Sequence, residues 1–123
     1  MGGAAEAGGA CWPWPTRLSL RVVVRPAAWR DLAGQAEHIA RDSPGAALRL
    51  LEAARAAFER LGAFPEIGKR RRFSHPDLSG VRSWSIPGFD KHVIFYRASD
   101  ERIDILRVIH SARDLSRIFG TER

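Results

Sequence analysis

Cysteine is nearly absent from this sequence, because Cys11 is the single one among 123 residues. A lone cysteine excludes a disulfide within the chain and any metal site built from several cysteines, and it fits a reducing compartment. The four histidines are scattered without the spacing of metal ligands. No apolar run approaches the roughly 20 residues of a membrane-spanning helix. We therefore expect a cytoplasmic protein that has no metal, no other cofactor and no membrane contact.

Acidic side chains are also in short supply, with 14 Asp and Glu against 20 Lys and Arg, for a net charge of +6. Residues 69–123 hold most of the excess, with 12 basic and 7 acidic side chains, whereas residues 1–68 hold 8 and 7. A basic half favours an acidic partner such as nucleic acid, the ribosome or an acidic protein segment. A basic surface that is merely solvated is the alternative.

The chain divides into a short extension and one domain. Residues 1–19 are rich in Gly, Ala and Pro and follow no helix or strand period, so we expect a flexible N-terminal extension. Residues 20–123 have the length and composition of a single globular domain.

The first half of the domain predicts a strand followed by two helices. A β-branched run predicts a strand over 20–25, and the proline that follows suits the first turn of a helix over 27–41. Ser43 is a good N-cap and Pro44 a good first residue for a second helix over 44–61, with Gly62 as its stop. The short break predicts an antiparallel hairpin. We expect Phe64 and Ile67 to pack beneath it.

The second half predicts three strands and a short helix. Residues 81–86, 91–97 and 103–109 alternate in polarity and are separated by turn sequences, so they should be antiparallel neighbours. In the last strand we expect Ile103, Ile105 and Ile109 on one face, with Leu106 and Val108 opposite. Residues 113–119 predict the final helix. The order β-α-α-β-β-β-α is an α+β fold, in which a helical hairpin covers one face of a small, mainly antiparallel sheet.

Several short segments share a family pattern in their order and spacing. They are Val-Arg-Pro-Ala-Ala at 24–28, Arg41-Asp42-Ser43-Pro44 with Ala46-Ala47, Leu61 with Phe64-Pro65 and Gly68, Phe95-Tyr96-Arg97, and Ile105-Leu106-Arg107-Val108-Ile109-His110 with Arg113-Asp114. Together they resemble the RelE/ParE toxin superfamily over about residues 21–119, and the last segment resembles its ParE branch. The resemblance implies the toxin of a type II toxin–antitoxin system, neutralised by a cognate antitoxin protein.

The resemblance implies two targets. ParE-like members are associated with poisoning DNA gyrase, whereas RelE-like members cleave messenger RNA on the ribosome. The ParE branch predicts a non-catalytic inhibitor of gyrase. The alternatives are a metal-independent endoribonuclease acting on ribosome-bound mRNA and a plain nucleic-acid-binding module.

Ribonuclease chemistry needs a base, an acid and cations around the scissile phosphate. The residues that could supply them are Arg71, Arg82, His92, Tyr96 and His110. Each has a structural alternative: Tyr96 as a core aromatic with a tethered hydroxyl, for example, and His110 as a turn-stabilising imidazole. Arginine is also a poor proton donor or acceptor, so we favour no catalytic residue.

Two binding surfaces are predicted. The residues expected to contact the target are basic: Lys69, Arg70, Arg71, Arg72, Arg107 and Arg113. The residues expected to contact an antitoxin segment that folds on binding are apolar and lie on the two helices: Trp29, Leu32, Ile39, Leu51 and Phe58.

Overall fold

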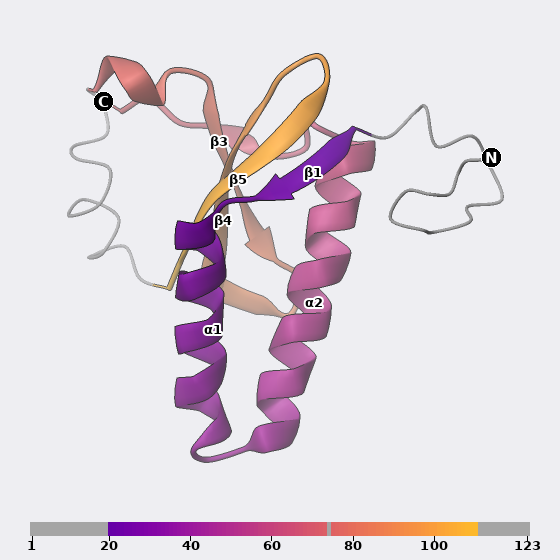
Figure 1. The fold of residues 1–123 in the computed structure, drawn as a ribbon, viewed down its shortest axis with the longest axis vertical. Helices are drawn as coiled ribbons and strands as arrows, with labels where there is room; N and C mark the ends of the chain where they lie inside the picture. The colour runs from indigo at the N-terminus through magenta and orange to yellow at the C-terminus, as the bar shows by residue number, and fades with distance from the viewer. Residues whose placement is uncertain (1–19, 74, 111–123) are drawn as a thin grey trace, which may run out of the picture.

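The computed structural model describes residues 20–73 and 75–110. The predicted extension over 1–19 and the predicted final helix over 113–119 lie outside these residues. The elements are β1 (Arg21–Val24), α1 (Pro26–Ala40), α2 (Pro44–Ala63), β2 (Lys69–Arg70), the 3₁₀ turn η3 (Pro76–Leu78), β3 (Val81–Ile86), β4 (Phe89–Ala98) and β5 (Arg102–Ile109) (Figure 1).

The strands form one sheet in the order β1-β5-β4-β3-β2. β1 runs parallel to β5, and the other neighbours are antiparallel. The helical hairpin carries the chain from β1 at one edge of the sheet to β2 at the other, and the antiparallel strands then lead back to β5 beside β1. The predicted α+β class, with the hairpin on one sheet face, is therefore confirmed. The two-residue strand β2 was not predicted, because it consists of Lys69 and Arg70 and has no apolar pattern.

The helix starts follow the sequence closely. Pro26 opens α1, and Ser43 Oγ accepts a hydrogen bond from the Ala46 amide at 3.2 Å as the N-cap of α2. The expected role of Gly62 is wrong, because α2 continues to Ala63 and Gly62 is buried inside it. A Cβ on Gly62 would lie 2.8 Å from the Leu20 carbonyl oxygen. Gly62 lets the chain entering β1 cross α2 in close contact.

The main core lies between the hairpin and the sheet. It includes Leu50 and Leu61 from α2 and Ile94, Tyr96 and Ile105 from the sheet, all fully buried. A smaller cluster on the opposite sheet face joins Phe73, Val81, Phe95 and Ile109. None of the helices in the described part of the chain is long and apolar enough to cross a membrane.

A β-bulge changes which side chains of β5 enter the main core. Phe95 pairs with Arg107 but Tyr96 pairs with Ile105, so Leu106 is an extra residue on β5. The extra residue reverses the alternation beyond it. Val108 consequently packs in the main core and Ile109 in the smaller cluster, opposite to the faces expected for both residues.

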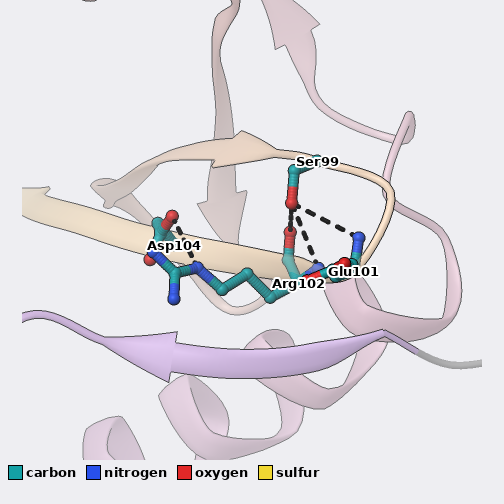
Figure 2. A network of polar contacts seen from close by, with 4 residues as sticks. All are labelled: Ser99, Glu101, Arg102 and Asp104. Carbon is teal, nitrogen blue, oxygen red and sulfur yellow. Dashed lines mark hydrogen bonds and ion pairs between the residues drawn. The ribbon is translucent and has the colours of Figure 1, made fainter.

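The hairpin turns use local hydrogen bonds and one glycine conformation. Gly88, between β3 and β4, has a φ of 84°, which favours glycine. Figure 2 shows the turn between β4 and β5, where Ser99 Oγ accepts from the Arg102 amide at 3.2 Å and from the Glu101 amide at 3.4 Å. Arg102 Nε also donates to Asp104 Oδ2 at 3.3 Å. These contacts hold β4 and β5 in register from the turn.

Candidate functional site

A basic hollow lies beside the short edge strand β2. It measures about 580 Å³ and is lined by Arg70, Arg71, Arg72, Phe73, His75, Pro76, Leu78, Ser79 and Gly80. Lys69, Arg70 and Arg72 are exposed, and Arg71 is half-buried. We call the surface formed by these nine lining residues the basic hollow. It contains three of the six residues expected to contact the target.

Arg71 is the half-buried cation of the hollow and is held by several contacts. Its Nη1 donates to Ser83 Oγ at 3.0 Å, and its guanidinium carbon lies 5.5 Å from the Phe95 ring centre and 5.8 Å from that of Phe73. Its backbone amide also donates to the Val81 carbonyl oxygen at 2.9 Å. Cation–π contacts and the serine together fix this side chain against the smaller cluster.

Tyr96 and Arg82 hold the loop that leads into the basic run. The buried Tyr96 hydroxyl donates to the Pro65 carbonyl oxygen and accepts from the Gly68 amide, both at 2.9 Å. Arg82 Nη1 donates to the Gly68 carbonyl oxygen at 2.8 Å. Burial raises the pKa of Tyr96, against the opposing effect of the Gly68 hydrogen bond. Both side chains are thus occupied in fixing the loop. Tyr96 is a core aromatic whose hydroxyl is tethered, which is the structural alternative given for it above.

His92 belongs to a second polar group, in the first half of β4 and away from the basic hollow. It is 7% exposed, and its Nδ1 lies 2.8 Å from Gln35 Oε1. Gln35 Nε2 donates to the Val108 carbonyl oxygen at 2.8 Å, so Oε1 accepts and His92 Nδ1 carries the proton. The His110 ring lies 4.6 Å away, centre to centre. Burial, and secondarily the charge of His110, lower the pKa of His92.

The lowered pKa of His92 predicts a loss of stability in mild acid. The unfolded chain takes up a proton near the ordinary value of 6.5, whereas folded His92 resists it. The contribution of neutral His92 to the free energy of unfolding should therefore be fully present above that pH. It should decrease as the pH falls below it, towards the folded pKa.

The measurement is urea unfolding at pH 7.5 and pH 5.0 for the wild type and His92→Gln. Because glutamine does not titrate, the variant should lose less stability than the wild type over this interval. Equal losses in both proteins would mean that other groups cause the pH dependence.

Arg107 is held by a bidentate ion pair that joins β5 to α1. Its Nε and Nη2 donate to Asp31 Oδ2 and Oδ1 at 2.6 and 2.8 Å, and the Val108 amide donates to Asp31 Oδ2 at 3.0 Å. The hydrogen bonds that Arg107 donates to Asp31 raise the pKa of Arg107. Arg107 does not line the basic hollow, so we leave it out of the target surface proposed below.

Asp31→Ala is expected to lower the free energy of unfolding by about 2–4 kcal/mol. The change leaves Arg107 without its counter-charge and the Val108 amide without its acceptor, and removing one partner of a buried pair costs about 3–5 kcal/mol. We take a lower range because the Arg107 side chain is 27% exposed. Urea unfolding of the wild type and Asp31→Ala measures this change in the free energy of unfolding. Glu37→Ala, which removes an exposed acid from the same helix, is the control and should change stability little.

The five residues considered for ribonuclease chemistry do not form one constellation. Tyr96 and Arg82 fix the loop over 65–68, whereas His92 contacts His110 at the other end of β4. His92 and Tyr96 are four residues apart on one strand, which separates their Cα atoms by about 13 Å. Arg71 belongs to the basic hollow, and Arg113 lies outside the described residues. In residues 20–73 and 75–110 there is also no group of three or more potential metal ligands.

The residues predicted to bind an antitoxin are divided between surface and core. Trp29 is 53% exposed and Leu51 is 38% exposed. Leu32 and Phe58 are buried in the main core, and Ile39 packs against it. Of the five, Trp29 and Leu51 are therefore the exposed residues, and Ile39 is half-buried. Leu48, at 65% exposed, adds an apolar side chain that was not expected. We call Trp29, Leu48 and Leu51 the hairpin apolar surface.

The segment after α2 also differs from expectation. Phe64 and Ile67 do not pack beneath the hairpin, because they are 55% and 39% exposed. They line an apolar hollow of about 440 Å³ with Arg60, Ala63, Pro65 and Glu66. The hydrogen bonds of Tyr96 with Pro65 and Gly68, and of Arg82 with Gly68, tie this loop to the sheet on either side of Ile67.

Asp31 and Gln35 are the polar residues that were not among those expected from the sequence. Both contact β5, and Gln35 also orients His92. A signal was present, since they are four residues apart and flank the apolar stripe of α1 next to Leu32 and Ala36. Polar residues at this spacing beside a buried stripe can reach the sheet that the helix covers.

Comparison with known proteins gives one family and one fold. Residues 22–115 match the family model described as the ParE toxin of the type II toxin–antitoxin system parDE. A solved structure of a chromosomal ParDE toxin–antitoxin system from P. aeruginosa is similar, with a TM-score of 0.61 and 20% sequence identity. The match covers 76% of this chain and 98% of that one. No curated protein matches the sequence.

Proposed function

Because this chain belongs to the ParE toxin family of type II toxin–antitoxin systems, we propose that it arrests bacterial growth by poisoning DNA gyrase and that a cognate antitoxin neutralises it in the cytoplasm. The proposal is of inhibition by binding, without a reaction catalysed by the toxin. The basic hollow is the surface through which the toxin would meet the gyrase–DNA complex.

The engagement of the Tyr96 hydroxyl is the observation that favours binding over catalysis. It donates to Pro65 and accepts from Gly68, so its proton is committed to the loop. Arg82, the cation paired with it across the strands, is likewise bound to backbone oxygens. Neither the Tyr96 hydroxyl nor the Arg82 guanidinium is therefore free to act as an acid or base in RNA cleavage. The exposed arginines of the hollow remain suited to an acidic surface.

The test is to pulse-label DNA and protein synthesis in bacteria within minutes of inducing the toxin alone. Early loss of DNA synthesis with a DNA-damage response is the expected result. Early loss of protein synthesis with cleaved mRNA would instead favour the ribosome as target. It would return attention to His92 and His110, the one pair of candidate acid–base groups in contact.

For the antitoxin we propose an amphipathic segment that folds along the hairpin apolar surface. Exposed Trp29 and Leu51 lie on the two antiparallel helices, so a segment laid along the hairpin can contact both. Tryptophan is enriched among residues that dominate binding energy.

Trp29→Ala is expected to weaken the antitoxin complex by about 1–3 kcal/mol, the usual effect of truncating an aromatic anchor. Titration calorimetry measures the change. Because Trp29 is half exposed, the variant should fold normally, and Glu37→Ala on the same helix is the matched control. An affinity equal to that of the wild type would remove Trp29 from the interface.

A further inference from the structure

We infer that the basic hollow binds the phosphodiester backbone of duplex DNA without reading its base sequence. This inference deepens the proposed function and rests on it, since a toxin that acts on gyrase acts where DNA is held. Three features of the hollow indicate this ligand: its exposed arginines, the hydrogen bonds that hold their backbone, and the burial of the nearby phenylalanine rings.

Charge is concentrated around the hollow. Residues 69–82 contain five basic side chains and one acidic one, Asp77. Within the described residues, neither Arg70 nor Arg72 makes an ion pair. Arg102 and Arg107 in β5, by contrast, each contact a carboxylate. The exposed arginines of the hollow therefore keep their charge available to a ligand.

The backbone that carries these cations is held on both sides. Before it, Tyr96 and Arg82 bind Gly68. Within it, the Arg71 amide donates to the Val81 carbonyl oxygen, and after it, Arg97 Nη1 donates to the Asp77 carbonyl oxygen at 3.2 Å. A preorganised set of arginines loses less conformational entropy on binding, and the planar guanidinium suits phosphate oxygens.

The aromatic residues near the hollow decide between duplex DNA and single strands. Phe73 is 8% exposed and Phe95 is 2% exposed, and both are covered in the smaller cluster. Single-stranded RNA is recognised mainly through unpaired bases that stack on exposed aromatic rings. Among its described residues, the hollow exposes no phenylalanine, tyrosine or tryptophan ring. Its exposed ring is the His75 imidazole, whose Nδ1 accepts from the Asp77 amide at 3.1 Å. Contacts to backbone phosphates carry no sequence information, so binding should be independent of base sequence.

The hollow is also remote from the hairpin turn. Figure 1 shows η3, which contributes to the hollow, at one end of the molecule, and the turn between α1 and α2 at the other. The hairpin apolar surface lies on α1 and α2 and shares no residue with the hollow, so antitoxin binding by a hollow variant serves as a check of folding.

The experiment measures fluorescence anisotropy of a labelled duplex of about 20 base pairs with the full-length toxin, between roughly 50 and 200 mM salt. With three or four phosphate contacts, log K should fall against log[salt] with a slope of about −3 to −4. Arg70→Ser/Arg72→Ser should weaken binding about 10- to 100-fold and reduce the slope by about 2. A duplex of different sequence should bind equally well.

Arg30→Ser/Arg49→Ser is the matched control. It removes two exposed arginines from α1 and α2 and gives the same net charge, so it should bind DNA nearly as the wild type does. Arg70→Lys/Arg72→Lys keeps the charge and should retain the salt slope. Equal losses in the hollow variant and the helix control would overturn the inference, because net charge alone would then explain binding. A preference for single-stranded RNA of equal length would overturn it too.

A supercoiling assay with purified gyrase separates this inference from the proposed function. A wild-type toxin that inhibits gyrase but does not bind DNA refutes the DNA site and leaves the target standing. A toxin that binds duplex DNA through the hollow but leaves supercoiling intact refutes gyrase as the target and leaves the site standing.

Discussion

Arg70→Ser/Arg71→Ser/Arg72→Ser is expected to abolish growth arrest while leaving antitoxin binding intact. The three arginines are consecutive in the sequence and all line the basic hollow. Their loss removes three positive charges from the surface proposed to meet the target, and clustered charges contribute both affinity and rate of association with an acidic partner. The hairpin apolar surface lies on other elements and should be unaffected.

Colony counts after induction in bacteria measure toxicity, and titration calorimetry with the antitoxin measures the complex. Arg71 also packs on Phe95, so the double variant that keeps Arg71 should be assayed in parallel to separate charge from folding. Arg30→Ser/Arg41→Ser/Arg49→Ser removes the same charge from the helices and their turn and should stay toxic. Growth arrest that persists in the triple variant of the hollow would make the basic run a merely solvated loop.

Gly68→Ala is expected to lower the free energy of unfolding by about 3–5 kcal/mol, through overpacking and the loss of buried hydrogen bonds. A Cβ at position 68 would lie 2.5 Å from Tyr96 Oη and 2.8 Å from the Ser83 carbonyl oxygen. These neighbours are a buried ring and the backbone of β3, and neither can move away cheaply. The loop must shift and break its bonds with Tyr96.

Urea unfolding measures this effect, and Gly34→Ala is the control. Nothing lies within 4 Å of a Cβ at position 34, on an exposed turn of α1, so that change should be neutral or stabilising by up to about 1 kcal/mol. Gly68→Ala/Tyr96→Phe removes the closest atom and should recover part of the stability. A Gly68→Ala protein as stable as the wild type would show that the loop is not held by Tyr96.

These two predictions concern the same part of the molecule, the loop over 65–68 and the basic run that follows it. Gly68 immediately precedes Lys69 and the basic run, so the bonds from Tyr96 and Arg82 determine where the run leaves the loop. Two residues considered as catalytic candidates thus support the surface that we propose for the target. Their reactive groups are used in folding, and the exposed arginines beside them remain for binding.

The local patterns of the sequence determined the element order and most of the boundaries. Period and capping signals suffice for α1, α2 and the three long strands, because Pro26, Ser43 and the alternating strands act through neighbouring residues. The same signals placed the hairpin on one face of the sheet. The basic run was equally visible, since consecutive charges require no partner to be recognised.

Tertiary structure decided the features that depend on residues far apart in the chain. The bulge that reverses Val108 and Ile109 arises from pairing with β4, and the place of Gly62 inside α2 arises from contact with Leu20. Arg107 and Asp31 are 76 residues apart, and their ion pair removes a cation that the sequence alone leaves free. The sequence states which residues are charged or apolar, but only packing in the folded protein determines which of them remain exposed to a partner.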